Sequence, residues 1–221
     1  RPDLQETYDR HAHTLDENRP AVVAKRHGMG YRMPRENIDQ LVDPGSFQEY
    51  WPLIVALQHQ RYDIDTLREK YPADGVVAGT ASINGEWFDD ERSRAAIVHY
   101  DYTVLAGTQG RRNHYKQDRM FELANRFRLP LILFSEGGGG RPGDDNTGPR
   151  VAFDTHTFTT LSKLSGLVPM IGINNGRCFA GNTAMLASCD VIIATESSTI
   201  GMGGPAMIEG GGLGIYTPEE V

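Results

Sequence analysis

Two loops rich in small residues carry the positions best suited to chemistry. The first, Ser135–Asp144, contains four consecutive glycines, and we call it the first glycine loop. The second, Asn174–Asn182, contains the pair Ala180-Gly181, and we call it the second glycine loop. Glycine loses more backbone entropy on folding than any other residue. A run of glycines therefore indicates that the backbone must approach a ligand closely, with a positive-φ turn or a linker as the structural alternative.

Together the two loops predict an oxyanion hole. Each loop follows an apolar run that is typical of a buried strand, and the second loop leads into a helix. Free N–H groups and the helix dipole at such a helix start favour negative charge. Backbone N–H groups from both loops can then bind one oxygen, which suits a thioester carbonyl that becomes an enolate. The residues expected to form this site are Gly138, Gly139, Ala180 and Gly181.

Other kinds of site are poorly represented. The sequence has no P-loop, no GxSxG elbow of a serine hydrolase and no histidine spacing typical of a metal site, so we expect no metal. Arg111, Arg112 and Lys116 form a small basic cluster, which is either a solvated helix start or a contact for the phosphates of coenzyme A. Cys178 and Cys189 are too few for a four-thiolate zinc site, and we expect them to be buried as small apolar residues.

The elements that must position these loops alternate between strands and helices. Asn84-Gly85 predicts a hairpin between strands at 76–83 and 95–104. Ser46 is expected to cap a helix that continues through Leu57. The later alternation predicts a mainly parallel sheet flanked by helices, which is an α/β fold. The other predicted elements are helices at 3–17, 35–42, 112–127 and 153–164, strands at 131–134, 169–173 and 191–194, and a helix that carries Met185, Leu186 and Cys189.

The bulk properties are typical of a globular chain. Its 221 residues are 39% hydrophobic and 23% charged, and the formal net charge of −7 argues against nonspecific binding of nucleic acid. No apolar run is long enough for a membrane span, and no secretory signal is visible. We therefore expect a cytoplasmic protein without a membrane partner. Because the chain starts at Arg1 and ends after an acidic pair, we interpret it as part of a longer chain.

Several segments, in order, resemble the carboxyltransferase part of biotin-dependent acyl-CoA carboxylases. The similarity extends from about Met33 to Val221, and the first glycine loop is most similar to that of large single-chain acyl-CoA carboxylases. One difference is Ala180, which replaces the first glycine of a family pair but keeps its backbone N–H. The segments that carry the resemblance are 34–47, 74–79, 136–141, 180–181 and 204–205, followed by an acidic segment near the end.

The resemblance implies a crotonase/ClpP-like fold, with an N-terminal helical arm at 1–45 and the main domain at 46–221. It implies the acyl-CoA-binding half of an enzyme that moves CO2 from carboxybiotin to the α-carbon of an acyl-CoA. The implied partners are the C-terminal carboxyltransferase half, biotin carrier and biotin carboxylase domains, and further copies in a homo-oligomer. The implied substrate contacts are Gly137, Gly140, Arg141, Arg111, Arg112 and Gly204, with bracing of the loop as an equal alternative for Arg141.

Two other functions stay open at the level of sequence. A hydratase or isomerase of the same fold would need one or two carboxylates aimed at its substrate, and Glu136 and Glu209 are the candidates near glycine-rich segments. A noncatalytic assembly domain of a carboxylase would self-associate without affinity for coenzyme A.

Overall fold

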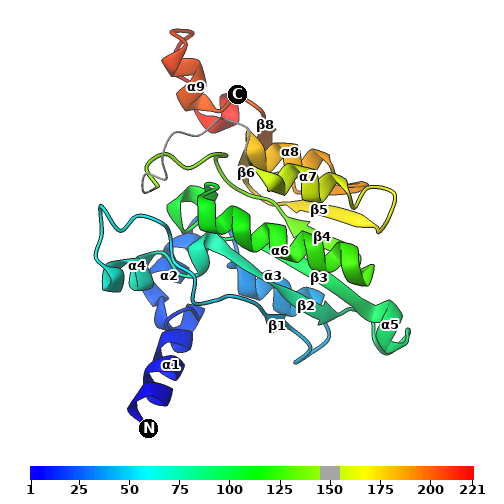
Figure 1. The fold of residues 1–221 in the computed structure, drawn as a ribbon. Helices are drawn as coiled ribbons and strands as arrows, with labels where there is room; N and C mark the ends of the chain where they lie inside the picture. Colours follow the sequence, from blue (N-terminus) through cyan, green and yellow to red (C-terminus); the bar gives the residue numbers. More distant parts are fainter. Residues whose placement is uncertain (145–154) are drawn as a thin grey trace.

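The computed structural model describes residues 1–144 and 155–221, in which helices surround one main sheet (Figure 1). The strands are β1 Gln48–Glu49, β2 Val76–Ser82, β3 Arg94–Tyr100, β4 Leu131–Phe134, β5 Met170–Asn174, β6 Arg177–Phe179, β7 Val191–Ala194 and β8 Thr199–Gly201. The α-helices are α1 Pro2–Ala12, α2 Pro20–Gly28, α3 Pro34–Leu41, α4 Ile64–Lys70, α5 Asp90–Ser93, α6 Arg111–Phe127, α7 His156–Ser162, α8 Gly181–Ala187 and α9 Pro205–Gly210. Short 3-10 helices lie at Asp16–Asn18, Ala73–Gly75, Leu105–Gly107 and Pro218–Glu220.

The main sheet determines where the glycine loops begin. Its strand order in the described residues is β1-β2-β3-β4-β5-β7, and β6 pairs with β8 in a small second sheet. β2 is antiparallel to β1 and β3, whereas β3, β4, β5 and β7 are parallel. Because neighbouring parallel strands end at the same edge of a sheet, the loops that follow β4 and β5 start next to each other.

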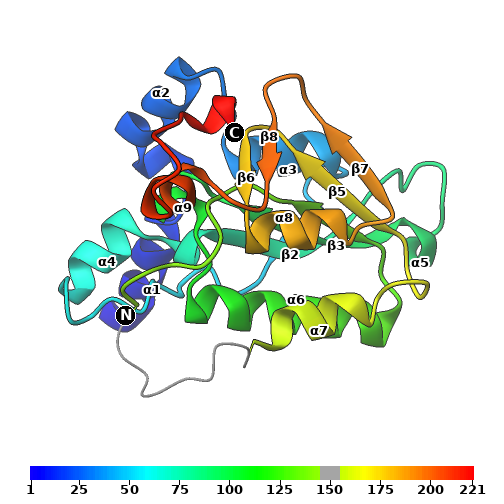
Figure 2. The same cartoon turned by 90° about the horizontal axis from the view of Figure 1, so that it is seen from above.

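Helices cover both faces of this sheet (Figure 2). On one face, α6, α7 and α8 bury side chains such as Phe121 and Leu161 against the strands in a first apolar core. On the other face, Ile38 of α3 packs with Ile97 of β3 in a second core. β3 and β4 are therefore buried between layers of helix, as expected for an α/β fold, whereas β7 at the edge of the sheet is exposed.

Most of the predicted elements are confirmed, with ends shifted by a few residues. β4 and β7 have the predicted bounds, and β2 and β3 form the predicted antiparallel pair. Their connection spans 83–93 and includes α5, so Asn84-Gly85 is only its first turn. The Asp43 carboxylate accepts the N–H groups of Asn84 and Gly85 at 3.0 and 2.8 Å. Phe153, the predicted start of α7, lies outside the described residues.

The helix predicted after Ser46 is wrong. The Ser46 hydroxyl accepts from the Ser82 N–H at 3.2 Å, and β1 pairs with β2. The Tyr50 N–H donates to the Ala78 carbonyl at 2.8 Å. The backbone of this segment is thus satisfied by the neighbouring strand, which competes with the helical hydrogen bonds that a cap would have started.

The N-terminal residues pack against the edge at which the parallel strands end. Arg19 forms an ion pair with Asp101, just after β3, at 3.0 Å, and both side chains are buried. Ile38 of α3 belongs to the second core, whereas α1 has no buried residue. The division into an arm at 1–45 and a domain at 46–221 stays a prediction.

Two further properties concern the described residues as a whole. None of their helices combines the length and the apolar character that are required to cross a bilayer. Within 1–144 and 155–221, no group of three histidine, cysteine, aspartate or glutamate side chains is arranged to hold a metal ion. Both cysteines are buried and free, which confirms the expectation for them.

Candidate functional site

The first glycine loop is fixed largely through its own N–H groups. Three of the four glycines donate to acceptors inside the protein. These acceptors are the Arg177 carbonyl for Gly137 at 2.7 Å, the Ala106 carbonyl for Gly138 at 3.2 Å, and Asn182 Oδ1 for Gly139 at 2.9 Å. The N–H of Gly140 has no acceptor among the described residues, and Gly140 is exposed. Of the four consecutive glycines, Gly140 is therefore the one whose N–H stays available in the described part of the chain.

Close packing explains why the loop is made of glycine. Gly137 has a φ of 135°, and a Cβ atom there would lie 2.2 Å from the Gly107 carbonyl oxygen. Gly139 has a φ of 80°, and a Cβ atom there would lie 2.6 Å from the methyl of Ala180. Both contacts exclude any larger residue, so two of the four glycines are required by their neighbours in the fold.

The second glycine loop leads through β6 into α8. Ala180 precedes the helix with φ 51° and ψ −121°, a conformation that side chains strongly disfavour. Its N–H donates to the Gly201 carbonyl at 3.2 Å. The N–H of Gly181, the first helical residue, has no acceptor in the described part of the chain, as is usual in the first turn of a helix.

The two loops lie against each other, as the sequence predicts. Gly137 and Cys178 form a parallel bridge, and a Cβ atom on Gly139 would lie 3.4 Å from the Gly181 nitrogen. The Gly139 carbonyl accepts from the Gln109 N–H at 2.6 Å, so the next N–H, that of Gly140, points away from Gln109. Among the glycines of the two loops that the sequence assigned to the site, Gly140 and Gly181 have N–H groups without an acceptor in residues 1–144 and 155–221. The other predicted donors are not available. The N–H groups of Gly138 and Ala180 donate to carbonyl oxygens inside the protein, and that of Gly139 donates to the side-chain amide of Asn182.

Arg141 braces the first glycine loop. Its guanidinium is 2% exposed, forms an ion pair with Asp74 at 2.5 Å, and donates to the Thr108 carbonyl at 2.8 Å. Burial raises the pKa of Asp74, and the charge of Arg141 opposes that rise. Asp144, at the end of the loop, accepts the Arg111 N–H at 2.9 Å and so caps α6. These contacts favour the bracing alternative for Arg141 over a contact with substrate.

The predicted basic cluster does not form as a unit. Arg111 is exposed at the start of α6, and Arg112 donates to the Val55 carbonyl at 3.2 Å. Lys116, one turn further, is fully buried, and its amine donates to the Val76 carbonyl. Burial lowers the pKa of Lys116 to about 8. Gly204, also predicted to contact substrate, packs on the ring of Phe179 beside the second glycine loop.

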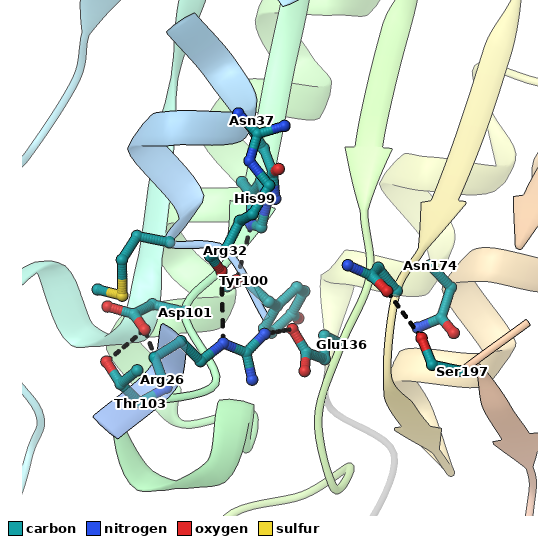
Figure 3. A network of polar contacts seen from close by, with 12 residues as sticks. Arg26, Arg32, Asn37, His99, Tyr100, Asp101, Thr103, Glu136, Asn174 and Ser197 are labelled. Carbon is teal, nitrogen blue, oxygen red and sulfur yellow. Dashed lines mark hydrogen bonds and ion pairs between the residues drawn. The ribbon is translucent and has the colours of Figure 1, made fainter. Parts of the chain in front are cut away.

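A buried ion pair connects α2 to the first glycine loop. Arg26 reaches from α2 to Glu136 at the end of β4, with 2.6 Å between Nη2 and Oε2 (Figure 3). The guanidinium also lies over the ring of Tyr31, 4.5 Å from its centroid. Burial raises the pKa of Glu136 to about 7, and Arg26 opposes this rise. Glu209, the other candidate carboxylate, is exposed on α9.

Sequence reasoning missed two residues that shape the site. Arg26 carries no motif, and only the fold brings α2 to the end of β4. Asn182 was counted as the end of a loop, yet it is fully buried and hydrogen-bonded to the first glycine loop. An asparagine directly after a glycine that opens a helix is the one available signal, because helix starts favour side chains that bond to backbone groups.

Known proteins share this sequence over most of its length. A family model for the carboxyl transferase domain matches residues 25–220. The propionyl-CoA carboxylase beta chain of Saccharopolyspora erythraea is 27% identical over 207 residues, which cover 93% of this chain and 36% of the relative. The methylmalonyl-CoA carboxyltransferase 12S subunit of Propionibacterium freudenreichii subsp. shermanii is 30% identical over 190 residues, which cover 85% and 33%. The chain thus spans about a third of the length of these curated relatives.

Solved structures extend the similarity to the fold. A single-chain, multi-domain long-chain acyl-CoA carboxylase matches all of this chain, and 22% of its own chain, with a TM-score of 0.94 and 56% identity. The transcarboxylase 12S structure, a hexamer assembly with hydrolyzed methylmalonyl-coenzyme A bound, matches 90% of this chain with a TM-score of 0.71 and 28% identity. These matches confirm the predicted crotonase-like fold and the resemblance to single-chain acyl-CoA carboxylases. On this evidence, the chain belongs to the carboxyl transferase domain family.

Proposed function

We propose that this chain is the acyl-CoA-binding half of a biotin-dependent acyl-CoA carboxyltransferase. One observation carries the proposal: in a chain of the carboxyl transferase domain family, two adjoining loops leave the N–H groups of Gly140 and Gly181 without acceptors in the described residues. Two such donors can hold the thioester oxygen while it gains charge as the α-carbon becomes an enolate. No side-chain nucleophile is needed for this task.

The other predicted contacts receive narrower roles in this proposal. Arg111, exposed at the start of α6, is available to the phosphates of coenzyme A, and Arg112 lies beside it. Gly137 gives the first glycine loop its shape through close packing, Gly204 lies beside the Phe179 ring, and Arg141 braces the first glycine loop through Asp74. The chain's contribution is thus orientation of the acyl-CoA and stabilisation of developing charge.

The carboxyl group must come from outside this chain. Biotin, when bound, supplies that group in activated form and a basic ureido nitrogen. We assign no biotin-holding residue here, because the resemblance places carboxybiotin on the C-terminal carboxyltransferase half. We propose that half, a biotin carrier domain, a biotin carboxylase domain and further copies of the chain as partners, in the cytoplasm. The hexamer assembly of the transcarboxylase 12S relative supports the oligomer.

The hydratase alternative finds little support in the placement of carboxylates. Glu136 is 6% exposed, and its carboxylate is engaged by Arg26 of α2. Glu209 lies on the exposed surface of α9. A hydratase needs a carboxylate within hydrogen-bond reach of its substrate. A noncatalytic assembly domain is distinguished by experiment, since it would show no affinity for coenzyme A thioesters.

The decisive test compares Gly181→Pro with Gly181→Ala in the full-length enzyme. A Cβ atom at this position would lie 2.4 Å from Gln109 Oε1, and both variants carry that contact. Only proline removes the N–H, and proline fits the first turn of a helix. We therefore expect a further loss of about 10²–10³ in carboxyl transfer for proline relative to alanine, with little change in acyl-CoA affinity.

Thermal unfolding of both variants serves as the control for folding. Equal rates for the folded proline and alanine variants would show that Gly181 does not supply the donor. A parent enzyme that neither binds nor carboxylates acyl-CoA would reject the proposed function as a whole.

A further inference from the structure

The side chain of Asn182 is buried at the site, and both its oxygen and its nitrogen are hydrogen-bonded. It is 0% exposed, and its amide makes three hydrogen bonds to backbone groups. Its Oδ1 accepts the Gly139 N–H at 2.9 Å. Its Nδ2 donates to the Glu136 carbonyl at 3.0 Å and to the Gly107 carbonyl at 3.2 Å. One acceptor and two donors are what a carboxamide offers, so no other side chain of this size can replace it.

These three bonds join segments that are far apart in the sequence. Asn182 belongs to the first turn of α8, Glu136 and Gly139 to the first glycine loop, and Gly107 to the 3-10 turn before α6. The turn and the loop already touch, because a Cβ atom on Gly107 would lie 2.5 Å from the Glu136 carbonyl oxygen. The amide therefore fixes how far the first glycine loop stands from the start of α8.

One of the two donors is next to Asn182 in the chain, and the other is next to a group that its amide holds. Gly181 precedes Asn182 directly, and Gly140 follows Gly139, whose N–H Asn182 binds. We propose that Asn182 is a positioning residue that sets the separation between the Gly140 and Gly181 donors. The inference rests on the proposed function and adds to it the side chain that determines the width of the oxyanion hole.

A second effect follows from the same contact. Asn182 occupies the Gly139 N–H, so that group cannot compete with Gly140 for the substrate oxygen. Oxyanion stabilisation depends on donors held at about 2.7–3.1 Å from the charged oxygen before it forms. A shift of about 1 Å in such a group costs on the order of 10²-fold in rate. Loss of the amide should therefore reduce catalysis more than substrate binding.

The test uses Asn182→Asp in the full-length enzyme. The carboxylate can still accept from Gly139, but it cannot donate to the Glu136 and Gly107 carbonyl oxygens and repels them instead. We expect single-turnover carboxyl transfer from the carboxylated carrier to acyl-CoA to fall by about 10²-fold. The KM for acyl-CoA should change by less than about threefold, since ground-state binding is not the step affected.

A matched control separates this role from a loss of stability. Thr157 of α7 is also fully buried, and its hydroxyl donates to Asp118 at 2.6 Å and contacts His114 Nδ1 at 2.8 Å, with no hydrogen bond to either glycine loop in the described residues. Thr157→Val removes both hydrogen bonds of this hydroxyl and should lower the melting temperature with transfer within about twofold of the parent. If Asn182→Asp fails to fold, Asn182→Ser keeps a small polar group and is measured in the same way.

Three results would overturn the inference. The first is a folded Asn182 variant that transfers the carboxyl group at nearly the parental rate. The second is a rise in the KM for acyl-CoA without a lower transfer rate. The third is a transfer rate that falls no further than that of Thr157→Val at equal melting temperature. If any of these occurs while Gly181→Pro still differs from Gly181→Ala, the proposed function stands and only the role of Asn182 is rejected.

Discussion

The two glycine loops meet at one site but are held in different ways. The first glycine loop is fixed by its own N–H groups and, in addition, by buried ion pairs of Arg26 with Glu136 and of Arg141 with Asp74. The second glycine loop is fixed by backbone pairing, because β6 bridges Gly137 on one side and pairs with β8 on the other. In the first loop, three of the four consecutive glycines donate their N–H groups to acceptors inside the protein. In the second, the N–H of Gly181 at the start of a helix has no acceptor in the described residues.

The difference shows that the number of glycines in a loop does not give the number of N–H groups available to a ligand. In the first glycine loop, Gly137 and Gly139 are needed because backbone and a methyl group approach them within van der Waals distance. Among the four consecutive glycines of this loop, only Gly140 combines open space around its Cα atom with an N–H that has no acceptor in the described residues. Glycine content therefore reports close packing first and ligand binding second.

The largest expected effect comes from the charged brace of the first glycine loop. Arg141→Met leaves the Asp74 carboxylate buried without its cation, and Asp74 Oδ2 already has no hydrogen-bond partner among the described residues. Breaking such a pair costs about 3–5 kcal/mol. We expect a loss of this size in the free energy of unfolding, measured by urea denaturation.

Arg177→Met is the matched control for that variant. Arg177 pairs with Glu219 at 2.9 Å, but both side chains are substantially exposed. Solvent-exposed pairs contribute about 0–1 kcal/mol. Similar losses for the two variants would contradict the distinction between a braced loop and a surface pair. The double variant Asp74→Asn with Arg141→Met should recover part of the loss, since no charge stays buried.

A smaller effect, dependent on pH, is expected at the other brace. Burial raises the pKa of Glu136 from 4.5 to about 7 in the folded chain. Between these values the folded chain keeps a proton that the unfolded chain releases, so this contribution to stability is lost as the pH rises. Glu136→Gln cannot ionise and lacks the decline.

The stability of Glu136→Gln relative to the parent should therefore increase from pH 5 to pH 7.5. Denaturation in urea at several pH values measures this difference directly. A difference that stays constant over this pH range would mean that Arg26 keeps Glu136 ionised in the folded chain, and that attraction rather than burial dominates the pair.

The smallest expected effect concerns the second glycine loop. Ala180 has φ 51° and ψ −121°, a strained conformation for a residue with a side chain. Ala180→Gly removes that strain, and the greater entropy of glycine in the unfolded chain offsets part of the gain. We expect a net stabilisation of about 1 kcal/mol. Ala184→Gly, within the same helix, should instead destabilise by about 1 kcal/mol, because its backbone is helical. Calorimetry on the two variants checks the opposite signs.

The fold was predictable where apolar runs are short and bounded. A run of four apolar residues that ends at a polar loop is too short for a helix and is typical of a strand. Both Leu131–Phe134 and Val191–Ala194 are such runs, and both form strands. The segment after Ser46 was not predictable, since its partner is β2, about thirty residues later in the chain. β6 and β8 are three residues each and depend on pairing with each other. Contacts between distant segments decided these elements, not local preference.

The sequence predicted which loops form the site, but not which backbone N–H groups in them are available. The adjacency of the two loops follows from parallel strand order, and Gly181 was placed by its position at a helix start. Which N–H groups stay free depends on acceptors such as the Ala106 carbonyl and Asn182 Oδ1, which lie outside any motif. The charge of Lys116 suggested a surface residue, but its position in α6 turns it toward the sheet.

Lys116 has a consequence for how the opening of this fold could be followed. Its amine lies against the Val76 carbonyl between α6 and β2 and is closed to solvent. A reagent that modifies amines meets Lys116 only after α6 has lifted from the sheet, whereas exposed lysines react at once. The rate at which Lys116 is modified would thus measure how often α6 separates from the sheet, because the amine does not react in the closed structure. Lys116, which the sequence places in a basic cluster at a helix start, would then report how often the helix beside the site moves.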